Sequence, residues 1–152
     1  MTERRPLSVD LVLAPVDASD ESTDAVAHAA AIAAEYDATV HVVHVLGEDV
    51  VRAIEAGRVD ENEVAADGEA IMQTAQSIAA EHDVDLSTSV AYGFSTTMKL
   101  RHPGSVVLDT AEELSADFLV VPREPLSGDP GEVLAKAAEY VLLYASQPVL
   151  SV

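Results

Sequence analysis

Five short apolar runs, separated by longer stretches with helical spacing, constrain the fold of this chain more than any other feature. Most of the runs are rich in valine and leucine and carry few polar residues, which is typical of strands buried on both faces of a parallel sheet. They are Leu11–Val16, Thr39–Leu46, Val84–Tyr92, Asp117–Val121 and Pro148–Val152. The sequence therefore predicts an α/β domain with helices over both faces of a mostly parallel sheet.

Between these runs, apolar residues recur at intervals of three and four, as they do on one face of a helix. This spacing predicts helices over Ser22–Tyr36, Glu63–His82, Gly104–Leu114 and Pro130–Ala145. We expect Glu48–Asn62 to be a charged connector, and Leu142 to face the core from the last helix. No linker or repeat interrupts the pattern, so residues 1–152 are predicted to form a single domain.

Acidic residues greatly outnumber basic ones. The chain has 27 Asp and Glu but only 8 Lys and Arg, which gives a net charge of -19. Because the acids are spread along the whole chain, the imbalance favours a surface adapted to a salt-rich cytosol, as in a halophile, over an acidic patch that docks a basic partner. Such a charge disfavours nucleic acids and anionic membranes as partners.

Several classes of protein are excluded by what the sequence lacks. No apolar run reaches the length of about 18 residues that suggests a membrane span, and the first residues show no apolar signal core. Cysteine is absent, so disulfides and thiol nucleophiles are excluded. There is no Gly-x-Ser-x-Gly motif for a serine nucleophile. We therefore expect a cytoplasmic protein that is not an enzyme.

A ligand site is expected at one edge of the sheet. Open parallel sheets bind ligands beyond the carboxyl ends of their strands, where the strand order reverses. If the chain winds outward from the first strand and then crosses to the fourth, a crevice lies between the loops that follow Val16 and Val121. Asp17 is on the first loop, and the second begins at Pro122.

The two ends of the sequence resemble a known family. LVLAPVDAS, followed by an alanine-rich helix and TVHVVHVL, resembles the opening of a universal stress protein (UspA-like) domain, and ADFLVVP with AEYVLLYASQPVLSV resembles its close. The resemblance implies a Rossmann-like, adenine nucleotide alpha hydrolase-like fold, an open five-stranded parallel sheet in the order 3-2-1-4-5. It also implies a homodimer through the last strand, whose residues here are Val149, Leu150, Ser151 and Val152.

The same resemblance offers a test for ATP. ATP-binding relatives carry Gly, two residues, Gly, nine residues, Gly and then Ser or Thr, and the aligned positions are Pro122, Pro125, Ala135 and Lys136, with Arg123 in the same loop. All four depart from the pattern. Glycine N–H groups donate to phosphate oxygens, whereas proline has no N–H. ATP binding is therefore disfavoured and no cofactor is expected, unless Lys136 replaces lost donors as a point charge.

The residues that face adenosine in that site are retained in this sequence. Asp17 and the backbone around Val45 match positions that face adenosine in nucleotide-binding relatives. An adenosine-type ligand without the triphosphate therefore remains compatible with the sequence.

Two further groups of residues are candidates for a binding site. Lys99, Arg101 and His102 concentrate positive charge after the third strand, where they form either an anion-binding loop or ion pairs and a dimer contact. His41 and His44 resemble a metal pair, but residues three apart on a strand point to opposite faces. We therefore expect two histidines at the sheet surface with their hydrogen bonds satisfied, and no metal site.

The leading hypothesis is a non-catalytic, stress-associated regulatory homodimer that lacks the usual ATP motif. The main alternative is a nucleotide-sensing switch or weak ATPase with a rebuilt phosphate loop. A third is a regulatory module for a transporter or another protein partner.

The acid excess predicts a fold that needs salt. The Debye length is about 30 Å at 0.01 M salt and about 3 Å at 1 M, so repulsion among the -19 charges is screened only at high salt. The melting temperature should therefore rise with KCl from low to molar concentration, as followed by circular dichroism. A melting temperature that stays constant over this range would contradict the halophilic interpretation.

Overall fold

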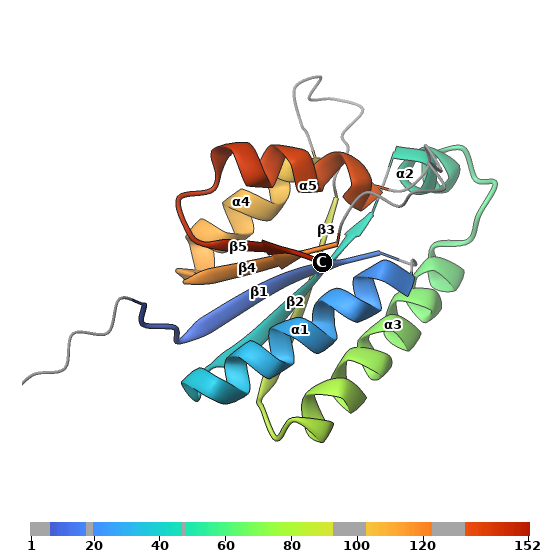
Figure 1. Cartoon of the computed structure of the whole chain (residues 1–152). Coiled ribbons are helices and arrows are strands. Elements are labelled where there is room, and N and C mark those ends of the chain that lie inside the picture. Colours follow the sequence, from blue (N-terminus) through green and yellow to red (C-terminus); the bar gives the residue numbers. More distant parts are fainter. Residues whose placement is uncertain (1–6, 18–19, 47, 93–102, 123–132) are drawn as a thin grey trace, which may run out of the picture.

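All five predicted strands form one parallel sheet in the order β3-β2-β1-β4-β5 (Figure 1). The computed structural model describes residues 7–17, 20–46, 48–92, 103–122 and 133–152. The strands are β1 (Leu11–Val16), β2 (Thr39–Leu46), β3 (Leu86–Tyr92), β4 (Phe118–Val121) and β5 (Val149–Ser151). The predicted fold class and strand order are therefore confirmed.

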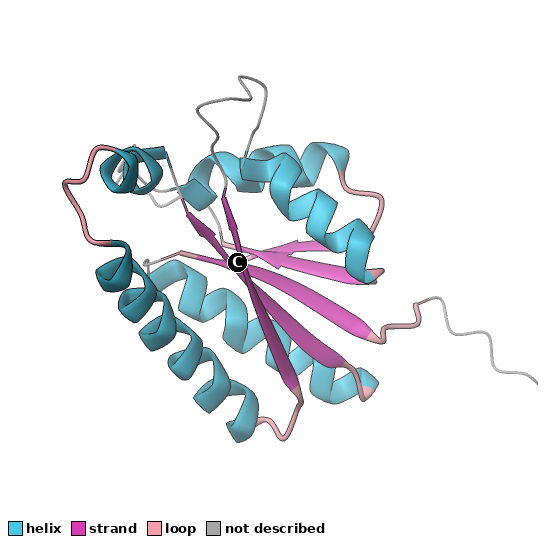
Figure 2. Cartoon of the chain, turned by 180° about the vertical axis from the view of Figure 1, so that it is seen from behind, coloured by secondary structure: helices cyan, strands magenta, loops and turns pink. Residues whose placement is uncertain are grey.

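Helices cover both faces of this sheet (Figure 2). They are α1 (Asp20–Tyr36), α2 (Glu48–Glu55), α3 (Glu61–Glu81), α4 (Pro103–Leu114) and α5 (Val133–Tyr144). One pair, α1 and α3, packs on one face, and the other pair, α4 and α5, packs on the opposite face. Within the described residues, no helix is both long and apolar enough to cross a membrane.

The middle strand β1 is buried on both faces. Val12, Ala14 and Val16 contribute to the core beneath α1 and α3, whereas Leu13 contributes to the core beneath α4 and α5. This division follows from the alternation of side chains along a strand. It also explains why β1 reads as a continuous apolar run rather than an alternating one.

The amino ends of β1 and β4 are tied together by Asp117. Its carboxylate oxygen Oδ2 accepts hydrogen bonds from the backbone N–H groups of Asp10 at 2.8 Å and Leu11 at 3.1 Å. Its own N–H donates to the carbonyl of Leu11 at 2.9 Å. The strand that the chain reaches after its long crossover is therefore fixed beside the first strand.

The expected connector Glu48–Asn62 is wrong in its first half, because Glu48–Glu55 forms α2. Val50, Val51 and Ile54 have the spacing of one helical face, a signal that is weak over only eight residues. Gly57 ends the segment with a φ of 70°, a conformation that favours glycine. Figure 1 shows α2 beyond the carboxyl end of β2.

The prediction that Leu142 faces the core is also wrong, because the side chain is 52% exposed. It follows buried Val141 by one residue, which is about 100° around the helix. Leu143 and Tyr144 are exposed as well, and so is Leu150 on β5. We call these four residues the α5–β5 apolar patch.

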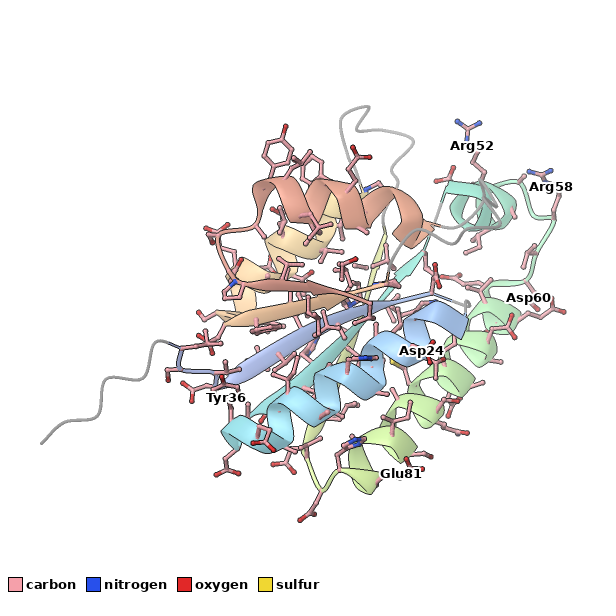
Figure 3. The ribbon with its side chains drawn as sticks, in the orientation of Figure 1. Asp24, Tyr36, Arg52, Arg58, Asp60 and Glu81 are labelled. Carbon is pink, nitrogen blue, oxygen red and sulfur yellow. The ribbon has the colours of Figure 1, made fainter. Side chains whose placement is uncertain are left out.

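Charged side chains project from the outer surfaces of the helices. Figure 3 shows Asp24 on α1 and Glu81 at the end of α3, with Arg52 and Arg58 standing away from the sheet near α2. Asp60 caps α3, where its Oδ1 accepts a hydrogen bond from the N–H of Asn62 at 2.9 Å. The acid excess among the described residues thus lies largely on the helical surface, where salt can screen it.

The close packing of α4 on α5 predicts a large effect at Gly104. A Cβ built there would lie 2.5 Å from Cβ of Tyr140, so the helices must move apart to accept it. We expect Gly104→Ala to destabilise the fold by about 1–3 kcal/mol, as overpacking does. Exposed Glu112→Ala on the same helix should change stability by less than about 0.5 kcal/mol. Denaturant unfolding in molar KCl measures both, and equal stability of wild type and Gly104→Ala would contradict this packing.

Candidate functional site

The strand order reverses between β1 and β4, because the chain winds outward from β1 through β2 to β3 and then crosses to β4 on the other side of β1. The carboxyl ends of these strands, at Val16 and Val121, lie at the same edge because the strands are parallel neighbours. In open α/β sheets this edge is where ligands bind. The expected crevice position, between the loops that follow Val16 and Val121, therefore lies at this switch point of the sheet.

Asp17 is buried immediately after β1. Its carbonyl oxygen accepts a hydrogen bond from Oγ of Ser22 at 2.9 Å, which ties the end of the strand to the first turn of α1. Because Val16 pairs with His44, Asp17 lies level with Val45, the next residue of β2. The structure thus brings together the two residues predicted to face adenosine.

The phosphate half of the predicted site is only partly described. Pro122 is buried directly after β4. Ala135 and Lys136 lie in the first turn of α5, and their side chains are outside the described residues. Arg123 and Pro125 are outside the described residues altogether. Of the loop, the structure therefore places Pro122 at the crevice.

The predicted anion-binding loop is not described either. Lys99, Arg101 and His102 all lie outside the described residues. Among the residues that the structure does describe, no group of three or more His, Cys, Asp or Glu side chains could hold a metal ion.

His41 and His44 lie on opposite faces of β2, as the strand periodicity predicts. His41 is on the side of Val43 and Val45, which pack under α4 and α5. Both of its ring nitrogens have partners, since Nδ1 lies 2.7 Å from Oγ of Ser87 and Nε2 lies 2.8 Å from Oγ of Ser89. Burial lowers the pKa of His41.

His44 faces the other way, towards α3. Burial lowers its pKa, and the nearby Asp17 charge opposes this shift. Gly68 of α3 leaves space for the imidazole, because a Cβ at that position would lie 3.0 Å from Nδ1 of His44. The sequence alone did not predict that Gly68 lies beside His44. A glycine in the middle of an apolar-periodic helix was the signal, since it marks a close approach.

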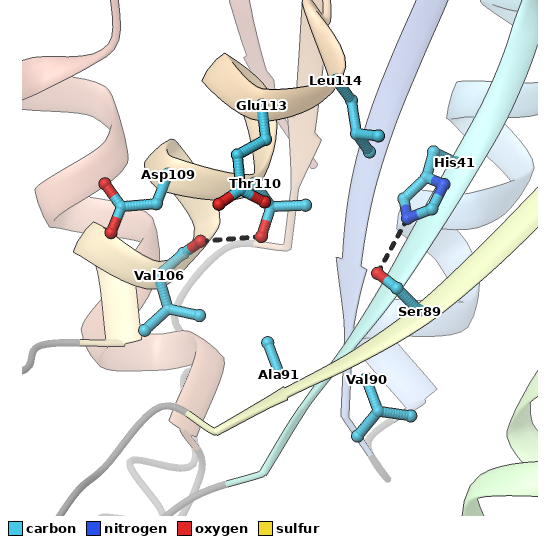
Figure 4. Close-up of a pocket in the computed structure, with 9 residues that line it drawn as sticks. All are labelled: His41, Ser89, Val90, Ala91, Val106, Asp109, Thr110, Glu113 and Leu114. Carbon is cyan, nitrogen blue, oxygen red and sulfur yellow. Dashed lines mark hydrogen bonds between the residues drawn. The ribbon is translucent and has the colours of Figure 1, made fainter.

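A separate pocket of about 490 Å³ lies between β3 and α4. Figure 4 shows the His41–Ser89 hydrogen bond on one wall and Asp109, Thr110 and Glu113 on the other. Asp17, Val45 and Pro122 are not among the residues that line it. It is therefore distinct from the crevice beside Asp17.

The fold and the crevice together define an α/β domain of the kind that binds ligands at a topological switch point. A family model described as the universal stress protein family matches residues 9–152. The chain belongs to the universal stress protein family.

Individual relatives agree with this assignment. The chain is 26% identical over 144 residues to the universal stress protein MJ0531 of Methanocaldococcus jannaschii, covering 93% of this chain and 80% of the relative. The structure of hypothetical protein MJ0577 matches with a TM-score of 0.74 at 18% identity, over 96% of both chains.

Two similar structures contain nucleotides. A universal stress protein in complex with cAMP matches with a TM-score of 0.66 at 24% identity, covering 95% of this chain and 97% of the other. The universal stress protein from Archaeoglobus fulgidus in complex with dAMP matches with a TM-score of 0.64 at 20% identity, covering 95% and 98%. At these identities the likeness concerns the fold.

Proposed function

We propose that this chain is a non-catalytic regulatory homodimer in a salt-rich cytoplasm, with a crevice that accepts an adenosine-type ligand but not ATP. The observation that carries the proposal is the composition of the crevice. Buried Asp17 and Val45 lie level with one another on its adenosine side, while Pro122 follows β4 on its phosphate side.

Pro122 argues against a phosphate site of the usual kind. The first residue after β4 is where the aligned glycine of ATP-binding relatives would present its N–H. Proline has no N–H and a fixed φ, so this position supplies no donor to a phosphate oxygen. Pro125 would remove a second donor from the same loop.

Two observations support an adenosine-type ligand. Asp17 has a carboxylate that accepts hydrogen bonds, and it sits at the switch point of the sheet. Relatives of the same fold form complexes with cAMP and dAMP, which carry one phosphate rather than three. A small ligand of this class needs fewer phosphate donors than ATP does.

A nucleotide-sensing switch or weak ATPase is the second candidate, and Lys136 favours it. That residue lies in the first turn of α5, where a cation could replace part of the missing donor set. A regulatory module for a transporter remains a third candidate.

The homodimer is supported by the second edge of the sheet. β5 is an edge strand, and an apolar edge strand is normally paired or covered. Leu150 on this strand is exposed, and so are the other residues of the α5–β5 apolar patch, which lie on the neighbouring helix. A second copy that pairs its Val149–Ser151 with this strand would cover both features.

We predict no ATP binding below about millimolar concentration. A hydrogen bond to a charged group contributes about 1.5–3 kcal/mol, so two missing donors weaken affinity by roughly 10² to 10⁴. Isothermal titration in molar KCl with Mg²⁺ tests this. Micromolar binding by the wild type would show that the loop is rebuilt, and loss of that binding in Lys136→Ala would assign it to the lysine.

The converse experiment restores the motif. Pro122→Gly, Pro125→Gly, Ala135→Gly and Lys136→Ser together should raise ATP affinity towards the micromolar range. If the quadruple variant shows no ATP binding, these four positions do not account for the missing ATP site.

We predict a dimer that dissociates when β5 is charged. Leu150→Lys places an ammonium group within the proposed contact, and light scattering at micromolar protein in molar KCl should then report a monomer. Val90→Lys makes the same type of change at an exposed residue of β3, the opposite edge strand, and should leave the dimer intact. A wild-type monomer, or dissociation by the β3 variant alone, would refute the β5 interface.

A further inference from the structure

The two buried histidines of β2 differ in their hydrogen bonds. His41 is 6% exposed and His44 is 7% exposed, so both are almost enclosed. His41 has a serine partner on each ring nitrogen. His44 makes no hydrogen bond to any part of the chain that the structure describes. A ring nitrogen without a partner in the protein is free to take its hydrogen bond from water or a ligand.

The unpaired nitrogens of His44 still reach accessible space. In the described part of the chain, no fully enclosed polar side-chain atom lacks a hydrogen-bond partner. The small exposed fraction of His44 must therefore include its ring nitrogens. This is the arrangement of a side chain that meets a molecule entering from solvent.

The position of His44 identifies where that molecule would lie. His44 pairs with Val16, so its neighbours at the carboxyl edge are Asp17 directly after β1 and Val45 on β2. Gly68 of α3 packs against the imidazole from the side, close enough that a Cβ would lie 3.0 Å from Nδ1. The ring is thereby held on the α3 side of the sheet, near its carboxyl edge and the Asp17 charge.

We propose that His44 is a ligand-contacting residue of the Asp17 crevice, where its neutral imidazole accepts a hydrogen bond from an amino or hydroxyl group of a bound nucleoside. This inference rests on the proposed function, because it assumes that the nucleoside binds beside Asp17 and Val45. It adds His44 to the residues that contact the ligand, and it predicts that nucleoside affinity depends on pH.

The hydrogen-bonding groups of Asp17 and His44 indicate which kind of ligand group they can bind. A neutral imidazole has one acceptor nitrogen, and an ionised carboxylate only accepts. Asp17 and His44 together therefore offer acceptors to a donor-rich group. The exocyclic amine of adenine and the hydroxyl groups of ribose are donors of this kind.

Protonation of His44 would reverse its role. An imidazolium has two donors and no acceptor, and it would pair with Asp17. Asp17, directly after β1, is the charged group that acts on His44. On α3, Gly68 carries no charge, and its neighbours Asp67 and Glu69 are exposed. Asp24 on α1 is exposed as well. The residue of β3 that pairs with His44 is Val90, which carries no charge. Because burial keeps the ring neutral near pH 7.5, nucleoside affinity should fall only as the pH drops below the ordinary histidine value of 6.5.

The test is isothermal titration with adenosine in molar KCl at pH 7.5 and pH 5.5. We expect the wild type to bind more weakly at pH 5.5. His44→Phe should weaken binding at pH 7.5 by about 2- to 12-fold, the range for one neutral hydrogen bond, and should lose the His44 part of the pH dependence. His41→Phe is the matched control, since it alters an equally buried histidine on the other face and should leave adenosine binding and its pH dependence unchanged.

A second variant keeps the test valid if His44→Phe folds poorly. Gly68→Ala adds a methyl group against Nδ1, so it should weaken adenosine binding in the wild type but have little further effect when His44 is already replaced. Inosine lacks the exocyclic amine, and 2′,3′-dideoxyadenosine lacks the 2′ and 3′ hydroxyls of ribose. The ligand for which His44→Phe no longer changes the affinity identifies the donor that His44 contacts.

The outcomes separate this inference from the proposed function. If the wild type binds adenosine and both His44→Phe and Gly68→Ala bind equally well, the His44 contact is refuted while the adenosine crevice stands. The contact is also refuted if His41→Phe removes the pH dependence and His44→Phe does not. If the wild type binds no adenosine at either pH, the adenosine part of the proposed function fails, and the His44 contact fails with it.

Discussion

The burial of β1 on both faces is the constraint on which the rest of the structure depends. A strand at the centre of the sheet needs a hydrogen-bonded neighbour on each side, since buried backbone groups without partners are costly. β2 and β4 meet that need, and Asp117 fixes β4 beside β1 at the amino edge. The chain must then wind outward in both directions from β1, which opens a crevice at the carboxyl edge between β1 and β4.

The two sides of that crevice differ in what they offer a ligand. The β1–β2 side combines a buried carboxylate, an imidazole without a hydrogen-bond partner in the described chain and a glycine that makes room for it. The β4 side begins with a proline, which cannot donate a hydrogen bond. A nucleoside with few phosphates satisfies both sides better than a triphosphate does. The difference between the sides is thus chemical and follows from residue type at defined strand ends.

Much of the fold could be predicted because its signals are local. The strands Leu11–Val16 and Thr39–Leu46 have the bounds that their apolar runs predict. Prediction failed where the deciding signal was short or depended on neighbours. Eight residues were too few to distinguish α2 from a connector. The outward direction of Leu142 follows only from the packing of α5, which contacts the rest of the protein through Val141 and Tyr140. For the candidate site, the resemblance predicted that Asp17, Val45 and Pro122 would line one crevice, and the structure places all three at the carboxyl edge.

The sequence by itself determined the order of the five strands and the four longer helices, the acid excess and the proline at position 122, because these depend only on residue type and local spacing. Only the tertiary structure decided that His44 lies beside Asp17 and against Gly68. These three residues are far apart in the chain and come from β2, the end of β1 and α3. The register of two parallel strands and the position of a helix across them bring the residues together, and neither can be read from the spacing along one segment.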